Sequence, residues 1–160
     1  LHYGQAAGPI LHYLNFLHDR AEAVPNSYMH FAGGLDNFGI DEQVIQAGLK
    51  AFEDALELAG DDMVLRARVE KASIAAYFAA SMEVSRWGHE HGYSKPPGEQ
   101  PRAKIPADLD ERTRPSIRRL LTLCDRYGVN WWGEGGEASK NSWTRAFFKR
   151  IYGIQDDGPF

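Results

Sequence analysis

Apolar residues recur at intervals of three and four along most of the chain, and this spacing constrains the fold more than any other feature. Such spacing places side chains on one face of an α-helix, which has about 3.6 residues per turn. The stretches that show it cover residues 3–21, 41–59, 62–87, 108–127 and 140–152. The sequence therefore predicts an all-α fold, an antiparallel helical bundle of about five helices with two long loops.

Local signals bound the two central helices. Asp41 belongs to a residue type that caps helix N-termini, and Gly60 is a typical stop, so a helix is predicted between them. Asp61 or Asp62 can cap the helix that follows. Because so short a turn separates the two helices, they are predicted to form an antiparallel hairpin.

Prolines leave two helix starts open. Pro9 falls within the first apolar stretch, so that helix either begins near Gly8 or kinks there. Asp108 with Glu111 resembles a capping box, whereas Pro115 is tolerated only in a first turn and favours a later start. The first helix is expected to bury one stripe, made of Tyr3, Ala7, Ile10, Leu14, Leu17 and Ala21.

Two connectors interrupt the helical pattern. Residues 24–40 combine turn-forming Pro, Asn and Gly with large apolar side chains, so we expect this loop to pack on the bundle. Residues 88–107 hold four prolines and three glycines, which predicts either an extended strap or a flexible segment. Residues 129–132 favour a short strand or an extended link.

Length, charge and cysteine content exclude several classes. A chain of 160 residues corresponds to one ordinary domain. Its net charge of −4 has the wrong sign for neutralising phosphates, so no nucleic-acid partner is predicted. No apolar run of about 18 residues exists to span a membrane. Cys124 is the only cysteine, which excludes an internal disulfide and a cysteine-based zinc site within one chain.

The charge is unevenly distributed. Residues 1–62 hold two cations against ten acids, a balance of −8, and residues 63–160 hold sixteen against twelve, a balance of +4. The two halves are therefore expected either to attract each other or to face a partner.

The pair His89 and His91 invites a metal-binding interpretation. On a helix, however, residues two apart point to different faces, so the pair could chelate a metal only if the segment were extended. A polar helix end is the favoured interpretation, and the sequence predicts neither a metal nor a cofactor.

The segment that begins with Trp131 and Trp132 is the densest unusual feature. Tryptophans on a loop can form flat platforms for sugar rings, and Glu134 could accept hydrogen bonds from sugar hydroxyls. With Tyr28 and His30 of the first loop, these residues are the predicted substrate-binding set. The alternative is that at least one tryptophan covers the core. No nucleophile or phosphate-binding motif is present, and no catalytic residue is predicted.

Two segments resemble a known bacterial family. The first is Tyr-Gly-Gln-Ala-Ala-Gly-Pro-Ile over residues 3–10, continued by Tyr-Leu-Asn-Phe-Leu-His over residues 13–18. The second is Leu-Thr-Leu-Cys-Asp-Arg-Tyr-Gly-Val over residues 121–129, followed by Glu-Gly at residues 134–135. Both are similar to the helical region of the family known as domain of unknown function 4838, and the helical pair at 41–87 fits the same layout.

The resemblance covers nearly the whole chain and implies an accessory helical domain. In that family such a domain follows a glycoside-hydrolase-like (β/α) barrel, akin to α-glucuronidases, in secreted or periplasmic proteins. It implies that residues 1–160 are one domain cut from a larger protein, with the upstream catalytic barrel as partner and carbohydrate as a further ligand. The chain alone is not expected to be active. The alternative is a protein-interaction or oligomerisation module without sugar contact, including a homodimer.

Overall fold

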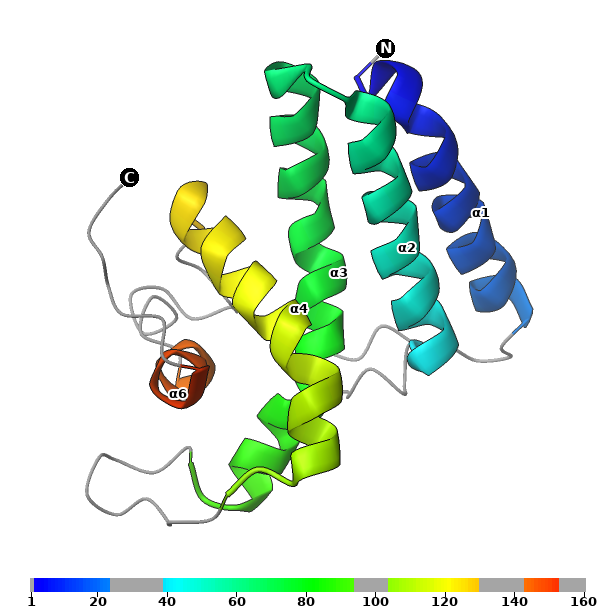
Figure 1. Ribbon diagram of the computed structural model, residues 1–160. Coiled ribbons are helices and arrows are strands. Elements are labelled where there is room, and N and C mark those ends of the chain that lie inside the picture. The colour runs from blue at the N-terminus through cyan, green and yellow to red at the C-terminus, as the bar shows by residue number, and fades with distance from the viewer. Residues whose placement is uncertain (1, 24–38, 94–103, 130–142, 153–160) are drawn as a thin grey trace. The chain divides into compact units, whose positions relative to one another are not determined.

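The computed structural model describes residues 2–23, 39–93, 104–129 and 143–152, with only the backbone for residues 143–146 (Figure 1). The regular elements are the 3₁₀ helix η1 (Gly4–Ala6) and the α-helices α1 (Ala7–Ala23), α2 (Glu42–Ala59), α3 (Met63–Glu90), α4 (Ala107–Arg126) and α6 (Trp143–Tyr152). No described residue lies in a β-strand, which confirms the predicted all-α helical bundle. The strand considered over residues 129–132 is absent at Val129, and its other residues lie outside the described ranges.

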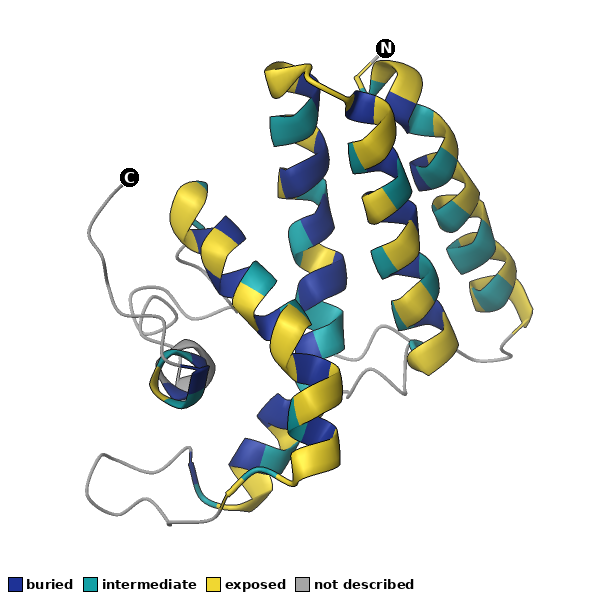
Figure 2. Cartoon of the chain, viewed as in Figure 1, coloured by how far each residue is buried: buried dark blue, intermediate teal, exposed yellow. Residues whose placement is uncertain are grey.

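The chain divides into two compact units, and α3 runs through both. Unit 1 comprises Leu1–Ala79 and unit 2 comprises Ala80–Phe160. In unit 1, α1, α2 and the first part of α3 lie side by side and antiparallel (Figure 1). Buried residues recur along α2 and the first part of α3 (Figure 2), and α1 contributes Ile10. The shared core consists of Ala6, Ile10, Phe52, Ala55, Ala59, Leu65, Val69 and Ala76, with Tyr3, Tyr13, Leu49, Leu56 and Ala72 packed against it.

The predicted hairpin between α2 and α3 is confirmed. Asp41 Oδ1 accepts a hydrogen bond from the Val44 amide at 3.0 Å and caps α2. Gly60 follows the last residue of α2 with a φ of 54°, a conformation that a glycine adopts without strain. Asp62, rather than Asp61, caps α3, because its Oδ1 accepts from the amide of Leu65 at 2.9 Å.

Helix α1 begins at Ala7, directly after η1, and Pro9 lies in its first turn. Of the two predicted arrangements at Pro9, the start near Gly8 is therefore the one that the structure shows. A proline in the first turn lacks an N–H that would have no partner within the helix in any case.

The predicted buried stripe of α1 is partly wrong. Ile10 is buried and Tyr13 is half-buried, with its ring centroid 6.3 Å from that of Phe52. Leu14, however, is 54% exposed and Ala21 is exposed. Consecutive residues of a helix are about 100° apart around its axis. Because Ile10 and Tyr13 face α2, Leu14 lies to one side of them and outside the core.

The predicted start of the second connector at residue 88 is also wrong. Helix α3 continues to Glu90, and Gly88 lies inside it. A Cβ atom at Gly88 would lie 2.7 Å from Phe147 Cε1, so the glycine is needed for a close approach. The chain leaves the helix at Gly92, which has a φ of 78°, and the Tyr93 amide donates to the Gly88 carbonyl at 2.8 Å.

Helix α4 differs from both predicted starts. It begins at Ala107 with Pro106 in the N-cap position, which makes no side-chain capping bond, so the capping box at Asp108 is wrong. Pro115 lies inside the helix, so the later start is wrong as well. Pro115 is exposed, and its cost is restricted to one missing backbone hydrogen bond and local crowding on the solvent side. The predicted stop at Gly128 is confirmed by its φ of 64°.

Unit 2 has its own apolar interior. Helices α4 and α6 are in contact, and the last part of α3 and the turn after it supply further buried side chains. The buried apolar residues of this unit are Val84, Tyr93, Leu109, Ile117, Leu120, Leu121, Leu123, Cys124, Phe147, Phe148 and Tyr152.

Candidate functional site

The side chains that the sequence nominates for carbohydrate binding lie outside the residues that the structure describes. They are Tyr28, His30, Trp131, Trp132 and Glu134. Their role stays a prediction, as does the packing of the loop at residues 24–40 on the bundle. The described residues offer a different candidate, on the surface of unit 1.

Three large apolar side chains are exposed where α2 ends and α3 begins. Leu58 is 47% exposed, Met63 is 75% exposed and Val64 is 63% exposed. We call these three residues the turn cluster. Isolated exposed apolar residues are common on proteins, but three of them within seven residues of one hairpin are a candidate interaction surface.

Local backbone contacts hold the turn cluster in place. Asp62 Oδ1 accepts from the amides of Val64 and Leu65, at 3.0 and 2.9 Å, and so fixes the first turn of α3. Gln5 Nε2 donates to the Leu58 carbonyl at 2.5 Å and ties η1 to the end of α2. The exposed side chains are therefore presented on rigid helix ends.

Acidic groups border the turn cluster, and the nearby arginines are engaged by backbone carbonyls. Glu57 and Asp61 are exposed. Arg66 Nη1 donates to the Gly60 carbonyl at 3.1 Å, and Arg68 Nη1 donates to the His2 carbonyl at 2.9 Å. A surface of this kind can bind an apolar partner edged by basic groups.

A second surface with exposed leucines lies on α1. Ala7, Leu11, Leu14 and His18 follow one another at intervals of four, three and four residues, and we call them the outer stripe. Leu11 is 58% exposed and Leu14 is 54% exposed. The single stripe predicted from the sequence combined the buried Ile10 with Ala7 and Leu14 of this surface.

The aromatic residues of unit 2 form an interior rather than an open platform. The ring centroids of Tyr93 and Phe147 are 4.8 Å apart, and those of Phe147 and Phe148 are 5.6 Å apart. All three side chains are buried. The Arg150 guanidinium lies 5.0 Å from the centre of the Tyr93 ring, a distance at which cation–π attraction operates.

His91 is held against the end of α3. Its ring stacks on Trp87 with a centroid distance of 4.4 Å and an interplanar angle of 19°. Its Nδ1 lies 2.8 Å from the Trp87 carbonyl, which also accepts a hydrogen bond from the His91 backbone amide at 3.1 Å. Within the described ranges, no group of three or more His, Cys, Asp or Glu side chains is arranged to hold a metal ion.

Tyr152 of α6 has a strongly raised pKa. Burial, followed by the nearby negative charge of Asp110, raises the pKa of its phenol to about 12. Its side chain is 3% exposed, and the Arg114 guanidinium lies 5.7 Å from its ring centre. A phenol held neutral in this way is not available as a base at neutral pH.

Buried polar residues on α3 were missed by the sequence interpretation, which treated this helix as apolar on its inner face. Glu70 is 5% exposed, and Ser73 is fully buried with its hydroxyl donating to the Glu70 carbonyl at 2.8 Å. Ser81 and Ser85, in unit 2, are also buried. The recurrence of serine at residues 73, 81 and 85 was the available signal, because small polar side chains fit where helices pack closely.

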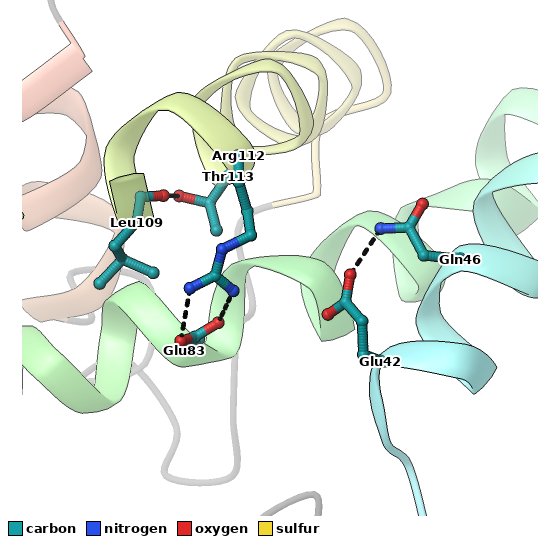
Figure 3. A network of polar contacts seen from close by, with 6 residues as sticks. All are labelled: Glu42, Gln46, Glu83, Leu109, Arg112 and Thr113. Atoms are coloured by element: carbon teal, nitrogen blue, oxygen red, sulfur yellow. Dashed lines mark hydrogen bonds and ion pairs between the residues drawn. The ribbon is translucent and has the colours of Figure 1, made fainter. Parts of the chain in front are cut away.

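The carboxylate contacts in Figure 3 are structural. Within α2, Gln46 Nε2 donates to Glu42 Oε1 at 2.8 Å. In unit 2, the Arg112 guanidinium binds both carboxylate oxygens of Glu83, with Nη2 2.9 Å from Oε1. The side chains of Arg112 and Glu83 are 43% and 51% exposed, so this pair contributes little to stability.

Comparison with known proteins identified no relative. No family model, no curated protein and no solved structure matches the chain. None of the described helices is both long and apolar enough to cross a membrane.

Proposed function

We propose that this chain is a helical protein-interaction domain that packs against another protein domain through the turn cluster. The observation that carries the proposal is the exposure of Leu58, Met63 and Val64 on the ends of two capped helices. Full burial of such a side chain by a partner stabilises a complex by about 1.5–3 kcal/mol. Methionine adapts to irregular partner surfaces, and Met63 is the most exposed of the three.

We infer the identity of the partner from the family resemblance. On that basis the chain is the accessory domain of a carbohydrate-active, glycoside-hydrolase-like protein, secreted or periplasmic, and the partner is its (β/α) barrel. Sugar binding by Tyr28, His30, Trp131, Trp132 and Glu134 belongs to the same proposal and rests on the resemblance and on residue chemistry.

Methionine oxidation tests the packing directly. The isolated 160-residue chain and the full-length parent protein are treated with dilute peroxide, and the sulfoxide at each methionine is followed by mass spectrometry. We expect Met63 to oxidise quickly in the isolated chain and several-fold more slowly in the parent protein. Met82, which is half-buried, serves as the internal control and should oxidise at the same rate in both. Equal rates at Met63 would contradict the proposal.

Activity gives a second, independent test. Aryl glycosides, including aryl glucuronides, are offered to both proteins, and release of the aryl alcohol is measured. We expect turnover by the parent protein and none by the isolated chain. Turnover by the 160 residues alone would show that the chain is an enzyme and not an accessory domain.

A further inference from the structure

The outer stripe of α1 has the spacing of a helix-pairing seam. Intervals of four and three residues keep side chains in line along one side of a helix, as in coiled coils. Leu11 and Leu14 occupy the middle of the stripe and are both more than half exposed. The smaller Ala7 and the larger His18 occupy its ends.

The surface around the outer stripe carries no formal charge over most of its length. Residues 1–18 include no Asp, Glu, Lys or Arg. The exposed neighbours Gly8, His12 and Asn15 are small or polar. Protein surfaces normally carry about 25–35% charged residues, so an exposed helix face without them is unusual. The first acids, Asp19 and Glu22, appear only near the C-terminal end of α1.

We propose that two copies of this chain associate through their outer stripes, with the two α1 helices antiparallel. This surface is distinct from the turn cluster, so the inference does not depend on the proposed function. A two-fold interface uses the same patch on both partners, which requires a patch that does not repel itself. The outer stripe meets that requirement.

The stripe is complementary to itself in the antiparallel direction. With the two-fold axis between Leu11 and Leu14, Leu11 of one copy meets Leu14 of the other, because the two are equally far from the centre. By the same rule Ala7 meets His18, so a small side chain faces a large one. Asp19 and Glu22 then lie beside the N-terminal turn of the other α1, where the helix dipole favours negative charge.

Charge disfavours a parallel pair of α1 helices and contact between two copies through their acidic surfaces. A parallel pair would place Asp19 and Glu22 of the two copies side by side. Residues 1–62 carry a balance of −8, so contact between two copies through the acid-bearing surface would be repulsive. The uncharged face of α1 allows two acidic chains to meet without that repulsion.

Sedimentation equilibrium of the 160-residue chain tests the association. We expect the mass to rise from 18.0 kDa toward twice that value as the concentration increases. The variant L11D/L14D should remain at the monomer mass, and L11Q/L14Q replaces it if circular dichroism shows that the aspartates unfold the chain. The control M63D places an aspartate on a more exposed residue of another surface, and this variant should still associate. A monomer at every concentration, or association unaffected by L11D/L14D or lost in M63D, overturns the proposal.

Disulfide trapping tests the direction of the pair. An equimolar mixture of A7C and H18C is oxidised, with the buried Cys124 as the only other thiol. Antiparallel pairing brings Ala7 beside His18 of the second copy and gives the mixed disulfide. Two copies of Ala7 would be about 16 Å apart, too far for a disulfide. Disulfides within the A7C or H18C population alone would overturn the antiparallel arrangement.

Discussion

Tyr152 combines a large buried ring with a hydroxyl that makes no hydrogen bond among the described residues. A buried, unpartnered hydroxyl costs about 1–3 kcal/mol, whereas the ring contributes by packing against Phe148, with centroids 6.3 Å apart. We expect Tyr152→Phe, which keeps the ring, to leave the free energy of unfolding at neutral pH unchanged or to raise it by about 1 kcal/mol. Urea unfolding measures the difference. A loss of more than about 1 kcal/mol would show that the hydroxyl has a partner.

The same residue predicts a loss of stability at high pH. Burial raises the pKa of Tyr152 to about 12 from the usual value of 10.0, so the unfolded chain releases this proton first. The contribution of the protonated Tyr152 to the free energy of unfolding is complete below pH 10. It is lost as the pH rises toward 12, by about 1.4 kcal/mol per pH unit. Urea unfolding across this range should show a shallower decline in Tyr152→Phe than in the unmodified chain. Parallel declines in the two proteins would contradict the assignment.

Asp41 predicts a change at the acidic end of the pH range. The hydrogen bond from the Val44 amide, with the neighbouring Arg20, holds the pKa of this carboxyl below its usual value. Its contribution to stability is therefore present above the pKa of the unfolded state and is lost as the pH falls through the folded-state value. Asp41→Asn retains a capping oxygen and should lose this pH dependence, while Asp41→Ala should lower the melting temperature at neutral pH. Thermal unfolding as a function of pH distinguishes the two variants.

At the scale of helices, two glycines mark where one element meets another. A Cβ atom at Gly48 of α2 would lie 2.7 Å from Tyr13 Cζ of α1, and one at Gly88 of α3 would lie 2.7 Å from Phe147 Cε1 of α6. Rings packed on a helix backbone leave no room for a methyl group.

Alanine substitutions test these close approaches. Gly48→Ala and Gly88→Ala should each destabilise the chain by about 1–3 kcal/mol, because overpacking outweighs the gain in helix propensity. Gly8→Ala in α1 is the matched control: its Cβ would meet nothing within 4 Å, so propensity alone should stabilise by up to about 1 kcal/mol. Urea unfolding measures all three variants. A neutral Gly88→Ala would mean that Phe147 does not pack on α3.

The same residues show which parts of the fold were predictable. Asp41 and Gly60 act through contacts with their immediate neighbours, so the α2–α3 hairpin follows from local sequence. Gly88 was expected to end a helix, because its closeness to Phe147 depends on packing between distant segments. Leu14 was misplaced for a related reason: α1 has two apolar seams, and only its packing on α2 decides which one is buried.

The candidate site was less predictable than the fold. The sequence drew attention to aromatic loops, and those loops lie outside the described residues. The turn cluster has no distinctive composition. In the sequence, Leu58, Met63 and Val64 look like the apolar residues that packed helices bury. Exposure distinguishes them, and exposure is a property of the folded chain.

For the whole molecule, the division into two units constrains how the chain unfolds. Each unit has its own buried residues, and α3 contributes to both, with its first part in unit 1 and its last part in unit 2. Proteins open in cooperative segments that follow such packing units. The first part of α3 is therefore expected to open when unit 1 is destabilised, and the last part when unit 2 is destabilised.

Hydrogen exchange can measure this separation. Gly48→Ala weakens the packing of α1 on α2, so amide exchange should accelerate in α1, in α2 and in α3 up to Ala79, and should be unchanged in α4 and α6. Gly88→Ala should give the complementary pattern, because Phe147 packs within unit 2. Gly8→Ala serves as the control and should accelerate amide exchange in neither unit. Equal acceleration in both units by either variant would mean that the chain unfolds as one cooperative body, with α3 transmitting the loss of packing along its whole length.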